Sequence, residues 1–167
     1  MKRFISCLIV AIPVIAWAAD KSSDQDFFKH AAEGGIAEVE AGNLAQSKGN
    51  SQAVKDFGAM MVKDHTAANA KLESIATGEN VKLPSSSGAI HMASKAKLEV
   101  LTGDTFDKAY IKNQVSAHEQ TVSLFKKEIA SGADAQAKTF AKKTLPTVQA
   151  HLRKIRDIAA QAGVETK

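Results

Sequence analysis

The sequence predicts an all-α fold, a four-helix bundle in which one long crossover joins the second helix to the third. Three observations lead to this prediction. Apolar residues recur every three or four positions along four long segments, glycines separate these segments, and one connection is far longer than the others. No segment shows the two-residue alternation of apolar and polar side chains that is typical of a half-buried strand.

The first eighteen residues are predicted to be a signal peptide. They begin with two positive charges, continue with an almost wholly apolar run at residues 4–15, and end in a small-x-small cleavage site, Ala-Trp-Ala, at residues 16–18. The apolar run is too short for a permanent membrane helix, and no later segment is long and apolar enough. We therefore expect residues 19–167 to form one domain in the periplasm or outside the cell, with no integral membrane segment after cleavage.

The composition of the remaining chain excludes two classes of protein. The only cysteine, Cys7, lies in the predicted signal peptide, so the domain must be stabilised by its core and not by disulfides. Loss of Lys2 and Arg3 lowers the formal net charge from +4 to +2, with 20 basic and 18 acidic side chains interspersed. A mixed surface of this kind indicates solvation, and we do not expect a nucleic-acid partner.

Four helices are predicted at residues 24–47, 52–77, 104–131 and 135–162. Each carries an apolar stripe that can face a common core. The stripes of the last three are Val54, Met61, Ala68 and Ile75; then Ile111, Val115, His118, Val122, Phe125 and Ile129; then Ala141, Leu145, Val148, Leu152, Ile155 and Ala159. The first helix instead has a face of small residues, Ala31, Gly35, Gly42 and Ala45, which would let another helix approach closely.

The ends of these helices have recognisable signals. Glycines stand at the expected ends and turns, at positions 49, 78, 103, 132 and 163. Ser51, Asp104 and Asp134 follow three of them, and their side-chain oxygens can accept hydrogen bonds from the first amides of the next helix. The long connection, residues 79–103, begins as a polar loop and continues into a short helix near 89–101. Short links favour antiparallel neighbours, whereas this crossover lets two helices run parallel.

Three histidines and one glutamate are the candidate site residues. His65, His118 and His151 lie near the middle of the second, third and fourth helices, and Glu38 lies near the middle of the first. In a bundle of helices of similar length, mid-helix positions share one level whichever way each helix runs. His118 belongs to its apolar stripe and His65 lies close to one, so we expect these two rings to point inward.

Two interpretations of this layer stay open. Three neutral imidazoles and a carboxylate that converge inside a bundle could bind one Zn²⁺, Cu²⁺ or Fe²⁺ ion. Alternatively, each histidine satisfies a hydrogen bond within the core and fixes the packing of its helix. Asp64 and Glu119, each adjacent to a histidine, point about 100° away around the helix. They could instead contact a neighbouring helix or support a ligand.

Several motifs also resemble a known family. They are Asp-His in the second helix, Phe-Asp-x-x-Tyr and His-Glu in the third, and Leu-Pro followed by His-Leu in the fourth. Together with "DFFKHAAEGGIAEVEAGNLA", they make residues 26–162 similar to bacterial exported proteins that are classed as a domain of unknown function and labelled outer-membrane or periplasmic. The resemblance implies a ferritin-like bundle and brings no established reaction.

The histidines lack the pattern of a di-iron site. Such sites need Glu-x-x-His on two helices, and the residue three positions before each histidine is a valine, at 62, 115 and 148. We therefore do not expect ferroxidase or oxygenase chemistry, nor an enzyme in the ordinary sense. Asp107 and Tyr110 lie three residues apart on one helix face, and we interpret them as a structural pair in which the carboxylate is available to the phenol.

A second functional class requires no metal. A periplasmic helical protein can present a face to other proteins as a stress-related or envelope-associated module, with crossover 79–103 as a movable cover. The sequence identifies no particular envelope partner and indicates no oligomeric state.

Overall fold

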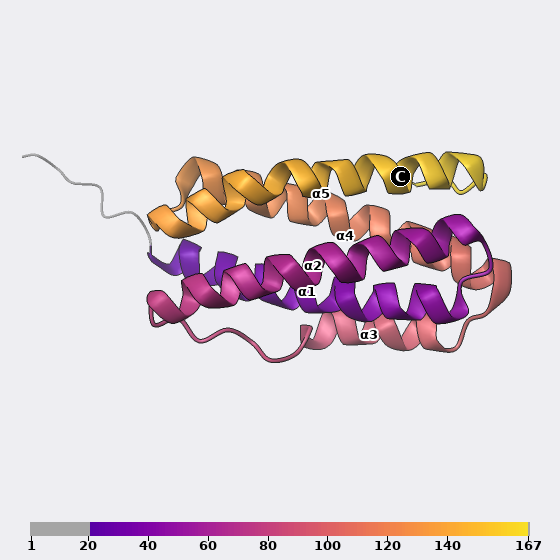
Figure 1. The fold of residues 1–167 in the computed structure, drawn as a ribbon, viewed down its shortest axis with the longest axis horizontal. Helices are drawn as coiled ribbons and strands as arrows, with labels where there is room; N and C mark the ends of the chain where they lie inside the picture. The colour runs from indigo at the N-terminus through magenta and orange to yellow at the C-terminus, as the bar shows by residue number, and fades with distance from the viewer. Residues whose placement is uncertain (1–20, 167) are drawn as a thin grey trace, which may run out of the picture.

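The computed structural model describes residues 21–166, so the predicted signal peptide lies outside the described residues. The described residues form helices and no strand (Figure 1). The helices are α1 (Lys21–Lys48), α2 (Gln52–Gly78), α3 (Gly88–Glu99), α4 (Gly103–Ser131) and α5 (Ala135–Gln161). The prediction of an all-α bundle whose long crossover contains a short helix is confirmed.

The helices are arranged as two antiparallel hairpins. Helix α1 packs mainly against α2, and α4 packs mainly against α5 (Figure 1). The crossover returns the chain to the end of the bundle where α2 began, with α3 lying along the outside of α1 and also contacting α4. As a result, α2 and α4 run in the same direction.

The face of small residues on α1 is the contact surface for α2. A Cβ atom added to Gly42 would lie 2.6 Å from the carbonyl oxygen of Gly58, and one added to Gly58 would lie 2.7 Å from the carbonyl oxygen of Gly42 and from Cβ of Ala45. Ala45 is fully buried. The two backbones therefore approach more closely than any larger side chains would allow, as the sequence predicted.

The apolar core consists of two clusters that lie one above the other along the bundle. One gathers around Phe57, Met61, Phe106, Ile111 and Ile155, and the other around Phe27, Leu72, Ala76, Phe125 and Phe140. The three histidines occupy the positions between them along their helices, because Met61 precedes His65 in the first cluster and Leu72 follows it in the second. A polar layer thus separates two aromatic-rich layers.

An aspartate near the start of one helix holds the turn of the opposite hairpin at each end of the bundle. The two oxygens of Asp24, in α1, accept hydrogen bonds from the backbone N–H groups of Ala133 and Asp134, at 2.8 and 3.1 Å. The two oxygens of Asp107, in α4, accept hydrogen bonds from the N–H groups of Asn50 and Ser51, at 2.9 and 2.8 Å. Each carboxylate thus accepts hydrogen bonds from two turn amides that would otherwise lack partners.

The prediction that Asp107 pairs with Tyr110 is wrong. Both carboxylate oxygens are engaged by the turn between α1 and α2, and the Tyr110 hydroxyl has no hydrogen-bond partner among the described residues. The sequence could not reveal this, because the turn that claims Asp107 lies more than fifty residues away.

The predicted helix caps are confirmed at two of three positions. The side chain of Ser51 accepts a hydrogen bond from the Val54 N–H, and that of Asp134 accepts one from the Ala137 N–H. The prediction for Asp104 is wrong, because α4 begins one residue earlier, at Gly103. The Asp104 carboxylate instead accepts a hydrogen bond from the side-chain amide of Asn50.

A second carboxyl group lies beside the Asp24 clamp. Glu128, in α4, is only 2% exposed. Burial, followed by the charge of Asp24 and a hydrogen bond with it, raises the pKa of Glu128 from 4.5 to about 7, and the charge of Asp134 acts in the same direction. We call Asp24 and Glu128 the carboxyl pair. Both oxygens of Glu128 lack a hydrogen-bond partner among the described residues, and a protonated Glu128 has a hydrogen that it can donate to the adjacent Asp24.

Candidate metal centre

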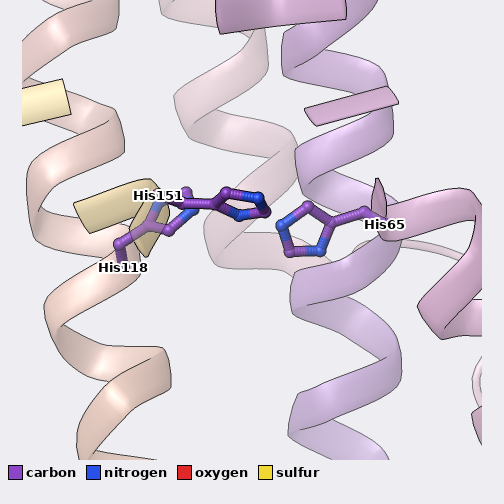
Figure 2. Close-up of side chains that lie close together, drawn as sticks. All are labelled: His65, His118 and His151. Carbon is purple, nitrogen blue, oxygen red and sulfur yellow. The ribbon is translucent and has the colours of Figure 1, made fainter. Parts of the chain in front are cut away.

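The three predicted histidines meet at the middle of the bundle, each from a different helix. His65 comes from α2, His118 from α4 and His151 from α5, and their exposed fractions are 9%, 1% and 3%. Their ring centroids are 5.6 to 5.9 Å apart, and one possible ligand nitrogen from each lies within 4.8 Å of the others. Figure 2 shows the rings pointing toward one another from their separate helices. We call these three residues the histidine cluster.

Hydrogen bonds determine which nitrogen of two rings is free. Nδ1 of His118 lies 2.9 Å from the carbonyl oxygen of Gln114, one turn earlier in α4, so this nitrogen carries the hydrogen and donates it. Nε2 of His151 lies 3.0 Å from Oδ2 of Asp64, in α2, and donates in the same way. In a neutral imidazole the other nitrogen then has an unshared electron pair. The unshared electron pairs are therefore on Nε2 of His118 and Nδ1 of His151.

Three buried nitrogens are left without a partner. Nε2 of His65, Nε2 of His118 and Nδ1 of His151 have no hydrogen-bond partner among the described residues. A buried polar atom without a partner costs free energy, so native proteins seldom keep one without a reason. Here each histidine has one such atom, on three neighbouring helices.

Burial keeps the rings neutral. It lowers the pKa of His65 from 6.5 to about 3, with further lowering from the charges of His118 and His151. Burial also lowers the pKa of His118 to about 4, against the opposing effect of the hydrogen bond to the Gln114 carbonyl. The pKa of His151 is lowered by burial too, although the hydrogen bond to Asp64 opposes the shift. Neutral rings are the form that binds metals.

The spacing of the nitrogens can be compared with that of a metal site. Zinc–imidazole bonds are about 2.0–2.1 Å long, which places three nitrogens around one ion about 3.5 Å apart. From separations of up to 4.8 Å, the rings need to close by about 1 Å. Changes of side-chain torsion can supply this movement without a shift of the helices.

Glu38, the fourth predicted residue, lies in the same layer but beside the engaged nitrogen of His118. Its Oε1 atom is 3.7 Å from Nδ1 of His118, and the side chain is 7% exposed. Burial raises the pKa of Glu38 to about 7, against a hydrogen bond to Gln114 and the charges of His151 and His91. Within the described part of the chain, the ligand atoms that lie within 4.8 Å of one another belong to the three histidines, and Glu38 does not join them.

The structure adds polar neighbours that the sequence did not indicate. Glu38, Gln114 and His91 line a cavity of about 20 Å³ between α1, α3 and α4. The Tyr110 hydroxyl is buried nearby, where burial and then the charge of Glu38 raise its pKa well above its usual value. His91 lies in the crossover, and nothing in its local sequence pattern shows that α3 lies against Glu38.

The predictions for Asp64 and Glu119 are confirmed, because both contact a neighbouring helix. Asp64 bonds to His151 in α5, and Glu119 forms an ion pair with Arg156, also in α5. Only the Asp64 contact reaches the histidine cluster. Asp64 is 33% exposed, so its carboxylate connects a buried ring to the surface.

Comparisons with known proteins agree with this fold. Residues 13–158 match the sequence model of a family described as a domain of unknown function, DUF4142. No curated protein matches the chain. Within residues 21–166, no helix combines the length and apolar character needed to cross a membrane.

Three solved structures share the bundle at low sequence identity. A DUF305 protein from Streptomyces coelicolor, whose description proposes that it is secreted, superposes with a TM-score of 0.73 at 14% identity, covering 87% of this chain and 96% of its own. A DUF305 fragment from Deinococcus radiodurans gives 0.74 at 10% identity, covering 86% and 98%. CopM in its Cu(I)-bound form gives 0.68 at 12% identity, covering 83% and 96%. The ferritin-like bundle is thus confirmed as the fold.

Proposed function

We propose that the chain, which belongs to the DUF4142 family, is an exported protein that binds one transition-metal ion through the histidine cluster. One observation carries the proposal: three buried, neutral ring nitrogens without hydrogen-bond partners face one another from three helices. A single ion that accepts all three lone pairs would remove the cost of burying them.

Copper in its Cu(I) state is the ion we favour over Zn²⁺ and Fe²⁺. The three donors are all nitrogens, and a fourth ligand is not among the groups that converge on them. Structural Zn²⁺ is almost always bound by four ligands, whereas a monovalent ion carries less charge into a buried, apolar layer. The bundle of CopM, which shares this fold, has been described with Cu(I) bound.

The protein residues have separate roles in this proposal. His65, His118 and His151 bind the ion, and Asp64 fixes the ring of His151 by accepting its Nε2 hydrogen. Glu38 next to His118 is predicted to support the site, either as a fourth ligand or as a nearby carboxyl group. A binding site of this kind suits capture or storage of metal and requires no reaction. The predicted signal peptide, residues 1–18, would place it in the periplasm or outside the cell.

A thermal titration tests the proposal. The chain from residue 19 is dialysed against a chelator and mixed with Cu(I) under reducing, oxygen-free conditions, or with Zn²⁺ or Fe²⁺, while Tm is measured. A ligand at a hundred times its Kd stabilises the native state by about 2.7 kcal/mol. For a domain of this size, that corresponds to a rise in Tm of roughly 5–10 °C.

Matched histidine variants make the test specific. His118→Leu should abolish the rise in Tm with metal, because it removes one of three ligands. His30→Leu should retain it, because the His30 side chain is 55% exposed and lies outside the cluster. The proposal fails if no metal raises Tm, or if both variants respond as the wild type does.

A protein-interaction module is the second candidate, and exposed apolar residues on the crossover favour it. The side chains of Ile90 and Val100 are 82% and 80% exposed, and that of Met92 is 55% exposed. All lie on or next to α3, where an envelope protein could bind. If metals have no effect on Tm, this interpretation takes precedence.

A further inference from the structure

We propose that the ion enters and leaves the histidine cluster through the seam between α2 and α5, and that Asp64 connects the groove on this seam to His151. The inference rests on the metal-binding function proposed above. It assigns an exchange route to a surface groove and a positioning role to a residue that is not itself one of the three converging ligands.

A groove of about 870 Å³ lies along this seam, with Asp64 among its lining residues. Its walls are made largely of small side chains, which leave the space between the two helices unfilled: Ala67, Ala68 and Ser74 from α2, and Thr139, Thr144 and Thr147 from α5. The Asp64–His151 hydrogen bond lies at one level of the seam, and a hydrogen bond from Gln136 to Glu79 lies near the opposite end of the two helices.

A small cavity lies between the groove and the site. It has a volume of about 30 Å³ and is lined by His65, whose Nε2 atom is one of the three unpartnered cluster nitrogens. Ala68, Phe140 and Thr144 line both the groove and the cavity, so these side chains form the wall between them. A cavity of this volume is large enough for one water molecule or one ion.

Among the described residues, the other sides of the bundle lack an open groove with a side chain that bonds to a cluster histidine. On the α1–α2 side, Gly42 and Gly58 bring the two backbones into close contact, and a groove of about 350 Å³ nearer the other end shares Asn69 and Leu72 with the small cavity but not Asp64. On the α1–α4 side, α3 lies over the helices, and the cavity beside Glu38 is only about 20 Å³. The seam between α2 and α5 combines an open groove with a side chain that touches a cluster histidine.

Asp64 has the chemistry and the position for the connection. Its side chain is 33% exposed while that of His151 is 4% exposed, so one carboxylate reaches both solvent and the buried ring. Lys71 and Lys143 also line the groove. Their positive charges favour an ion that arrives bound to an anionic chelate, which would release the ion to the carboxylate at the inner end.

The test compares the rate of metal exchange with the affinity. The chain is loaded with one equivalent of Cu(I), and the metal is extracted by bathocuproine disulfonate, an anionic chelator, in a stopped-flow instrument. Ala67→Trp places an indole in the groove next to Asp64. It should slow extraction about tenfold or more, while the equilibrium competition with the same chelator changes less than about twofold.

A matched variant and a second blocking variant complete the design. Ala70→Trp, at an exposed position of α2 outside the groove, should exchange at the wild-type rate. Thr147→Trp fills the groove from α5 and should slow exchange as Ala67→Trp does. If the wild-type chain binds Cu(I) and all three variants release it at the wild-type rate, the route is overturned and the proposed function stays intact. A chain that binds no Cu(I) at equilibrium would overturn both.

Discussion

The histidine cluster and the carboxyl pair both contain buried polar atoms without hydrogen-bond partners, yet they differ in what can satisfy those atoms. Burial drives each toward its neutral form, lowering the pKa of His65 to about 3 and raising that of Glu128 to about 7. Neutral Glu128 has a hydrogen to donate, and Asp24 is next to it. The neutral histidines have facing nitrogens without hydrogen-bond partners among the described residues, and those of His118 and His151 carry lone pairs.

This difference separates a structural polar cluster from a ligand site. The carboxyl pair has its own donor, the hydrogen of protonated Glu128, and Asp24 also supports a turn by accepting two backbone hydrogen bonds from the loop between α4 and α5. The free nitrogens of His118 and His151 need a partner that accepts electron pairs, and a metal ion does so. We therefore expect changes at the carboxyl pair to alter stability and changes around the histidine cluster to alter affinity.

The largest expected effect is on stability. Asp24→Ala leaves the Ala133 and Asp134 amides without their acceptor and should lower the free energy of unfolding by about 2–4 kcal/mol. Urea denaturation measures the change. Asp26→Ala, at an exposed position two residues further along α1, is the matched control. Affinity for Cu(I) should stay within about twofold of the wild type. A parallel loss of affinity would contradict the separation of the two regions.

The next effect is on affinity. Asp64→Ala removes the acceptor that fixes the His151 ring and should weaken Cu(I) binding about 10- to 100-fold. Asp64→Asn retains a side-chain oxygen as acceptor and should recover most of the affinity, which a loss of packing alone would not explain. Glu119→Ala, whose partner Arg156 lies outside the cluster, is the control. Competition with a Cu(I) chelator measures all three, and equal affinities would remove Asp64 from the site.

The smallest effect is a difference in pH dependence. His65 and His118 are harder to protonate in the folded protein than in the unfolded chain. The free energy of unfolding is therefore highest above about pH 6.5 and falls as the pH drops toward the folded pKa values of about 3 and 4. For Glu128 the folded pKa is raised, so stability is present below about pH 4.5 and falls as the pH rises through 7.

Glu128→Gln tests this opposition. The amide cannot ionise, so the variant should lose less stability than the wild type between pH 5 and 8, by about 1 kcal/mol or more. Glu38, whose pKa is also raised to about 7, should still contribute a loss in the same range. Urea denaturation at several pH values provides the measurement. An unchanged pH dependence would mean that Glu128 is ionised in the folded protein.

The sequence predicted the features that depend on local periodicity. Seven-residue spacing predicted α2, and the mid-helix positions of His65, His118 and His151 predicted that they share one level. The caps at Ser51 and Asp134 could also be predicted from the sequence, because a capping side chain and its amide lie three residues apart. These features follow from helix geometry alone.

Long-range pairing could not be predicted in the same way. Asp24 contacts a turn 109 residues away, and α3 brings His91 close to Glu38 through a crossover whose path depends on packing. Gln114 and Glu128 are buried although they lie beside the predicted stripe of α4. Helix α4 packs against α1, α3 and α5, so its buried surface is wider than a single stripe.

The most direct test of the account is a crystal structure of the chain loaded with one equivalent of Cu(I), with the ion located by its anomalous scattering. We predict a single strong peak at mid-bundle, within about 2.0–2.1 Å of Nε2 of His65, Nε2 of His118 and Nδ1 of His151. An ion bound instead at the carboxyl pair or at an exposed histidine, with the three rings still separated, would contradict it.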